Sequence, residues 1–191
     1  MHTASKLGVF TVAALLLGGT VLASTANAAD KPVPSNKSVE IVQFAGGQGH
    51  GLALDKNAPE GTKETLESNT LAAAATANVC GAGYTISTGA WRYGTNGTTY
   101  TWTNGTSTGG SYYDKPICAV FFNDTGSTRY MGVRLNDNYT STAATQDFGS
   151  YSTYAGPVYQ KRGYCGTVYS YMKSSSGAVV IDNVQTVGSC N

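Results

Sequence analysis

Short runs of alternating apolar and polar residues, separated by glycine, fill the chain from residue 79 onward. Thr, Val, Tyr and Phe dominate these runs, and such residues favour half-buried β-strands. A turn at Thr125-Gly126 is expected to join the strands at 118–124 and 127–135 as a hairpin. No convincing helical period separates the runs, so an all-β antiparallel sandwich or open β-barrel is predicted and parallel βαβ architecture is disfavoured. The strand signals cover 118–124, 127–135, 158–163, 167–173 and 178–185.

The strongest hairpin signal is Asn96-Gly97, which lies between two aromatic runs. A two-residue type I′ turn at this dipeptide sets Tyr93 opposite Tyr100 and Trp91 opposite Trp102. Because side chains alternate across a strand, the four rings are expected on one face. Such rings either fill a core, which is their more frequent fate, or stack on sugars. The hairpin therefore predicts a candidate ligand-binding face of Trp91, Tyr93, Tyr100 and Trp102.

The apolar run at residues 7–23 differs in kind from the later strands. It follows one firm positive charge, Lys6, and leads to the small-x-small sequence Ala26-Asn27-Ala28. This is the pattern of a secretory signal peptide over residues 1–28. Its uninterrupted apolar stretch is shorter than the roughly 20 residues that span a bilayer, so cleavage after Ala28 is favoured over a retained anchor. The mature chain is expected to be secreted, with no membrane insertion after cleavage.

A change in composition near residue 79 divides the mature chain. Residues 29–78 contain Pro32, Pro34, Pro59 and a glycine cluster at 46–51, whereas residues 79–191 hold all 13 tyrosines, both tryptophans and all four cysteines. We interpret 29–78 as a flexible leader or pro-segment, with an arm docked on the folded domain as the alternative. Residues 79–191 are predicted to be a single β-rich, disulfide-stapled domain.

The four cysteines predict two disulfides, because an even number in an exported chain is typical of a disulfide framework. Four cysteines allow three connectivities. We predict that nearest neighbours pair, Cys80 with Cys118 and Cys165 with Cys190. A zinc site is disfavoured, because the chain has no Cys-x-x-Cys pair and residues 79–191 contain no histidine.

The net charge and the types of side chain present argue against several classes of function. Removing residues 1–28 leaves 11 basic and 11 acidic side chains, so there is no electrostatic reason to expect nucleic acid as a partner. Residues 79–191 contain neither histidine nor glutamate, which argues against Ser-His-Asp and Cys-His sites. A glycosidase with two aspartates, Asp114 and Asp147, stays an alternative. We therefore predict that the protein is not an enzyme and uses no cofactor.

The segment 136–141, which reads Asn136-Asp-Asn-Tyr-Thr-Ser141, resembles the calcium loop of microbial βγ-crystallin domains. Oxygen donors on a turn suit Ca²⁺. A plain surface turn explains the same residues, since Asn, Asp and Ser favour turns. No metal ligand is assigned from this segment.

The chain contains Cys80-Gly-Ala-Gly-Tyr84, a string from Gly149 to Tyr159 with a Tyr-Ala-Gly-Pro-Val-Tyr core, Cys118, Cys165 and Val133-Arg134-Leu135. Together these motifs resemble the spore-associated protein A family, which consists of small secreted proteins of filamentous actinobacteria. The resemblance covers roughly residues 79–191 and implies export and association with the spore or cell surface. It brings no catalytic residues. The chain departs from the family in its leader of about 50 residues before the first cysteine.

These observations predict a secreted, non-catalytic protein associated with a spore or cell surface. The alternative is an extracellular glycan- or protein-binding module of the lectin or inhibitor type. The expected partner is a cell-surface glycan or another extracellular protein.

Overall fold

A computed structural model describes residues 39–42, 52–188 and 190, all within one compact unit. The predicted signal sequence at 1–28 and residues 29–38 and 43–51 of the predicted leader lie outside the described residues. Where the chain is described, it forms ten strands and two short helices. None of the helices in these ranges has the length and apolar character needed to cross a membrane.

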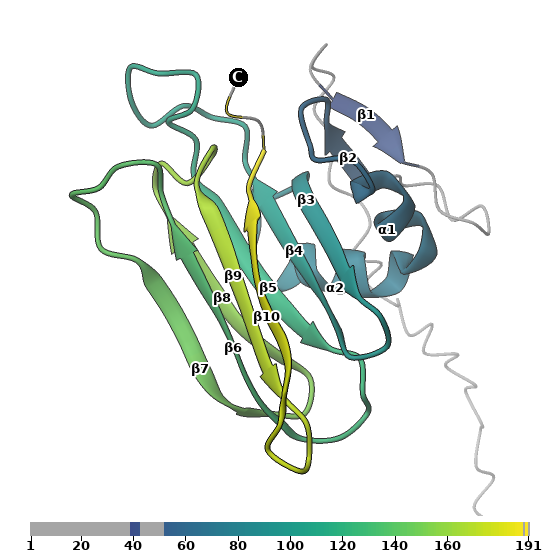
Figure 1. The fold of residues 1–191 in the computed structure, drawn as a ribbon. Coiled ribbons are helices and arrows are strands. Elements are labelled where there is room, and N and C mark those ends of the chain that lie inside the picture. The colour runs from purple at the N-terminus through teal and green to yellow at the C-terminus, as the bar shows by residue number, and fades with distance from the viewer. Residues whose placement is uncertain (1–38, 43–51, 189, 191) are drawn as a thin grey trace, which may run out of the picture. The chain divides into compact units, whose positions relative to one another are not determined.

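The described strands form two sheets, as predicted for a sandwich (Figure 1). Their orders are β1-β2-β3-β4-β5-β8 and β10-β9-β6-β7. Neighbouring strands are antiparallel except β2 and β3. The six-stranded sheet contains β1 (Val39–Val42), β2 (Leu52–Asp55), β3 (Ile86–Tyr93), β4 (Gly97–Thr103), β5 (Ile117–Asn123) and β8 (Tyr154–Gln160). The four-stranded sheet contains β6 (Arg129–Asn136), β7 (Thr145–Tyr151), β9 (Thr167–Lys173) and β10 (Val179–Thr186).

Strand β5 is buried on both faces and separates two hydrophobic cores. Ile117, Ala119 and Phe121 pack between the two sheets. Cys118 and Val120 point the other way, into a second core between the six-stranded sheet and the helices. The near-continuous apolar sequence of β5 follows from this position, because neither face of the strand meets water.

Helices α1 (Thr62–Ser68) and α2 (Thr70–Val79) cover the outer face of the six-stranded sheet (Figure 1). Leu66 of α1 and Ala73 of α2 are fully buried in the second core. Helices this short depend on tertiary packing rather than on their own propensity. Residues 52–78, which we call the arm, therefore pack against the six-stranded sheet. Removal of the segment as a pro-sequence stays a prediction.

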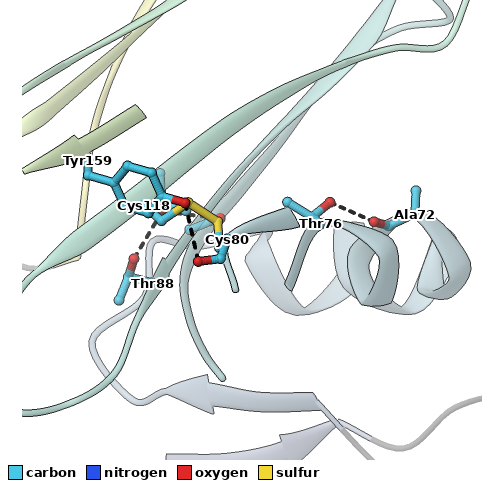
Figure 2. Close-up of a disulfide and its surroundings, with 8 residues drawn as sticks. Ala72, Thr76, Cys80, Thr88, Cys118 and Tyr159 are labelled. Atoms are coloured by element: carbon cyan, nitrogen blue, oxygen red, sulfur yellow. Dashed lines mark hydrogen bonds between the residues drawn. A yellow bond between two sulfur atoms is a disulfide. The ribbon is translucent and has the colours of Figure 1, made fainter. Parts of the chain in front are cut away.

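Both predicted disulfides are confirmed. Cys80 bonds to Cys118 with 5.9 Å between their Cα atoms, and Cys165 bonds to Cys190 with 4.9 Å. Figure 2 shows that the first bridge ties the end of α2 to β5, while the Tyr159 hydroxyl donates a hydrogen bond to the carbonyl of Cys80 at 3.3 Å. The arm is thus covalently joined to the middle of the six-stranded sheet.

The hairpin expected at Thr125-Gly126 is wrong. Strand β5 pairs with β4 and β8, whereas β6 pairs with β7 and β9, so the connection between them passes from one sheet to the other. Asn123 holds this turn, since its side-chain nitrogen donates to the carbonyls of Ser127 and Tyr151 at 2.8 and 2.9 Å. A glycine-containing turn in the sequence does not by itself show whether the two strands that it connects belong to the same sheet.

Candidate functional site

The turn between β3 and β4 differs from the predicted one. Gly94 has a φ of 58°, and the Asn96 amide donates to the Tyr93 carbonyl at 3.1 Å. Gly97 is already in β4, where it pairs with Tyr93. The loop is therefore three residues long instead of two. The observed pairing of the two strands is therefore shifted by an odd number of residues from the predicted pairing. Because side chains alternate between the two faces of a strand, different side chains now share a face.

The new register divides the four rings of the predicted ligand-binding face. Trp91 and Tyr93 pack against the core between the sheets. Tyr100 and Trp102 lie on the opposite face of the sheet, fully buried beneath the arm. The structure does not bring Trp91, Tyr93, Tyr100 and Trp102 together, and core packing accounts for each of them.

The two aspartates considered for catalysis both accept hydrogen bonds from neighbouring parts of the fold. Asp114 is buried and accepts hydrogen bonds from the Tyr139 hydroxyl at 2.5 Å and the Ser111 amide at 2.9 Å. The hydrogen bond from Tyr139 is the main cause that lowers the pKa of Asp114. Asp147 accepts from the Tyr151 hydroxyl at 2.5 Å and the Gly156 amide at 2.7 Å. Asp114 thus holds the loop between β4 and β5, and Asp147 links β7 to β8.

The loop that resembles a calcium site also forms a turn. Asp137 Oδ1 accepts a hydrogen bond from the Tyr139 amide at 2.9 Å, and the Asn136 amide group donates to Thr167 Oγ1 at 3.3 Å. Among the described residues, no group of three or more His, Cys, Asp or Glu side chains could hold a metal ion. The turn interpretation accounts for both side chains.

The outer face of the four-stranded sheet carries a different aromatic cluster, which the sequence reasoning missed. Side chains of β6 and β9 alternate between the inter-sheet core and this outer face. The rings of Tyr130, Phe148, Tyr169 and Tyr171 lie on the outer face, and we call these four residues the aromatic platform. Tyr130 is 46% exposed, and the other three are half-buried because they pack against one another.

Three rings of the platform form a compact triangle. The ring centroids of Tyr169 and Tyr171 are 6.3 Å apart, and Phe148 lies 6.3 Å from Tyr169 and 6.5 Å from Tyr171. Their planes are tilted by 30° to 44°. Tyr130 extends the platform, with its ring edge-on to Tyr171 at 6.4 Å. The rings come from three neighbouring strands, so the backbone sheet sets their spacing.

Glycine at position 132 makes this arrangement possible. Gly132 pairs with Tyr171 on one side and Phe148 on the other. The Phe148 ring lies across the Gly132 backbone, in the space that a Cβ atom would occupy. Phe148 can therefore reach the tyrosines of β9, two strands away in the sheet.

Charged groups border the platform. The Arg134 guanidinium lies 4.8 Å from the ring centroid of Tyr169, and the Lys173 ammonium lies 5.6 Å from that of Tyr130. Asp182 of β10 lies beside Tyr169: burial raises the pKa of the Tyr169 hydroxyl, and the Asp182 carboxylate raises it further. Rings with polar groups beside them suit a ligand that presents both apolar C–H faces and hydrogen-bonding groups.

One sequence signal pointed toward this face. Within β9 the pattern Val168-Ser170-Met172 faces the core, and the intervening Tyr169 and Tyr171 must therefore face outward. Nothing local in the sequence indicates that Phe148 joins them.

Comparison of the chain with protein-family models, with characterised proteins and with solved structures finds no match.

Proposed function

We propose that this protein is a secreted, non-catalytic carbohydrate-binding protein that attaches to a cell or spore surface through the aromatic platform. The observation that carries the proposal is a cluster of four rings on a sheet face, bordered by polar and charged side chains. Tyrosine rings at an exposed site offer a flat apolar surface together with a hydroxyl, which suits the C–H and O–H groups of a sugar ring.

Other features support the extracellular part of the proposal. The sequence of residues 1–28 has the pattern of a secretory signal, and two disulfides favour an oxidising compartment. The resemblance to the spore-associated protein A family supports the spore or hyphal surface as the location. The intact mass of protein from the culture medium tests export: it should correspond to a chain that starts at Ala29 or later, and a retained Met1 would contradict secretion.

The non-catalytic part rests on the side chains of the platform. Its rings have no carboxylate pair beside them, because Asp182 is the one acidic side chain on this face among the described residues. General acid and base catalysis of glycoside hydrolysis needs two carboxyl groups. The platform is therefore suited to binding a sugar rather than cleaving it.

Sedimentation with insoluble polysaccharides tests the proposal. Purified protein is mixed with cell walls, chitin or cellulose, and the bound fraction is compared between wild type, Tyr130→Ala, Tyr171→Ala and a control, Tyr112→Ala. Tyr112 is 49% exposed, close to the 46% of Tyr130, but it lies in the loop between β4 and β5, where its ring contacts Tyr113 and Tyr164 instead of the platform rings. We expect the platform variants alone to lose binding. Equal binding by all four proteins, or none by wild type, would refute the proposal.

A further inference from the structure

We propose that the ligand of the platform is an acidic polysaccharide whose sugar rings carry carboxylates, and that Arg134 and Lys173 bind those carboxylates. This inference rests on the proposed function and names the class of carbohydrate. It follows from the positions of the two cations and from the fact that neither forms a salt bridge with a carboxylate in the described part of the chain.

Arg134 lies on β6, an inner strand of the four-stranded sheet. Its side chain points outward, because Arg134 pairs with Tyr169 on one side and Gln146 on the other. Stacking on the Tyr169 ring restricts the guanidinium without using its N–H groups. In the described part of the chain, no hydrogen bond or ion pair of this guanidinium is found. A planar fork held in this way is prepared for bidentate contact with a carboxylate.

Lys173 supplies a second cation at the end of β9. Its ammonium lies over the Tyr130 ring, and no ion pair with a carboxylate is found for it in the described ranges. Arg134 and Lys173 therefore border the platform on two sides.

The acid on the face does not neutralise these two cations. Asp182 lies near the Tyr169 hydroxyl, and within the described residues it forms no salt bridge with Arg134 or Lys173. The face thus presents two cations whose charge is not paired within the sheet, in a mature chain with 11 basic and 11 acidic side chains. A partner of opposite charge gains from this local excess.

The rings favour a carboxylated sugar over a polymer of phosphodiesters. A uronic acid carries its carboxylate on the same ring that offers an apolar face for stacking, so one sugar residue can meet a platform ring and a neighbouring cation together. Polymers whose charge lies on acyclic phosphate linkers offer charge without that stacking face. The carboxylated polysaccharide therefore uses both features of the site.

A matched pair of polymers tests the inference. Polygalacturonate and its methyl ester share the same sugar ring, but the ester lacks the negative charge. Affinity electrophoresis and calorimetry compare both polymers with wild type, the double variant Arg134→Gln/Lys173→Gln, and the control Lys161→Gln. Lys161 is an exposed lysine in the loop after β8.

We expect wild type and the control to bind polygalacturonate at least about tenfold more tightly than the ester, and the double variant to lose about tenfold in affinity. Binding to polygalacturonate should also weaken between about 0.01 M and about 0.15 M sodium chloride.

Two results would overturn the inference in different ways. Equal affinity for polygalacturonate and its ester, with both lowered by Tyr171→Ala, would refute the acidic ligand and leave the proposed carbohydrate function standing. Failure of wild type to bind these polymers and every insoluble polysaccharide would refute both. A phosphodiester polymer such as a teichoic acid, bound more tightly than polygalacturonate, would also refute the carboxylate assignment.

Discussion

The ring of Phe148 lies across the backbone of Gly132, so that a Cβ atom at position 132 would overlap the ring. The two residues are direct neighbours across the β6–β7 pair. The absence of a side chain on β6 therefore determines whether a ring from β7 can join the tyrosines of β9.

Replacing Gly132 with alanine should lower polysaccharide binding while the protein loses only a little stability. The Phe148 ring must leave its place over β6, so polysaccharide binding should fall. The stability cost should be about 1 kcal/mol, at the low end for overpacking, because the half-exposed ring can rotate toward solvent. Chemical denaturation and sedimentation with polysaccharide measure the two effects. Gly110→Ala is the control, because a Cβ there meets no atom within 4 Å. Unchanged binding by Gly132→Ala would show that Phe148 is not part of the site.

Two buried tyrosines should respond oppositely to removal of their hydroxyl groups. Tyr100 and Tyr164 are both fully buried. The Tyr100 hydroxyl has no hydrogen-bond partner among the described residues, whereas the Tyr164 hydroxyl donates to Asp55 at 3.2 Å. Tyr164→Phe leaves a buried carboxylate without this bond and should cost about 1 to 3 kcal/mol, while Tyr100→Phe should be neutral or stabilising by up to about 1 kcal/mol.

Thermal and urea unfolding of the two phenylalanine variants provide the comparison, and each variant serves as the control for the other. A larger loss for Tyr100→Phe than for Tyr164→Phe would contradict the described hydrogen bonding.

The two disulfides should differ in their sensitivity to a mild reductant. Cys80 and Cys118 are buried, whereas Cys165 is half-buried and Cys190 is exposed. Thiol–disulfide exchange requires access of the attacking thiolate. Under native conditions Cys165 and Cys190 should therefore be alkylated first, as followed by peptide mass mapping. Simultaneous labelling of all four cysteines at every time point would indicate global unfolding instead of local access.

Acid should weaken the contact between Tyr139 and Asp114. The folded-state pKa of Asp114 lies below its ordinary value of 3.8, mainly because of the hydrogen bond from Tyr139. A lowered carboxyl pKa contributes stability above the unfolded pKa, and this contribution is lost as the pH falls through the folded value. Tyr139→Phe should thus destabilise the protein near neutral pH, and its difference from wild type should shrink below pH 3.8.

Melting temperatures of wild type and Tyr139→Phe across this pH range test the linkage. Tyr130→Phe, which removes an exposed hydroxyl elsewhere, is the control. A difference between wild type and Tyr139→Phe that does not change with pH would exclude a role for the titration of Asp114.

Much of the fold follows from local sequence alone. The predicted strand at 167–173 coincides with β9, because its strict alternation permits one face in the core and one outside. Both disulfides join cysteines that are neighbours along the chain. Strand positions depend on local alternation, and each bridge joins a cysteine to the next one along the chain, at separations of 38 and 25 residues. Pattern and spacing were therefore enough to predict them.

The register, the arm and the platform required the tertiary structure. Asn96-Gly97 is a good type I′ turn sequence, yet Gly97 lies in β4 because its backbone packs closely against Phe121 and Phe122 of β5. Leu66 and Ala73 become core residues only once the arm docks. The rings of Tyr130, Phe148 and Tyr171 are brought together by pairing between strands far apart in sequence. Local propensity contains no information about which distant strands pair, because that choice depends on the packing of the whole sandwich.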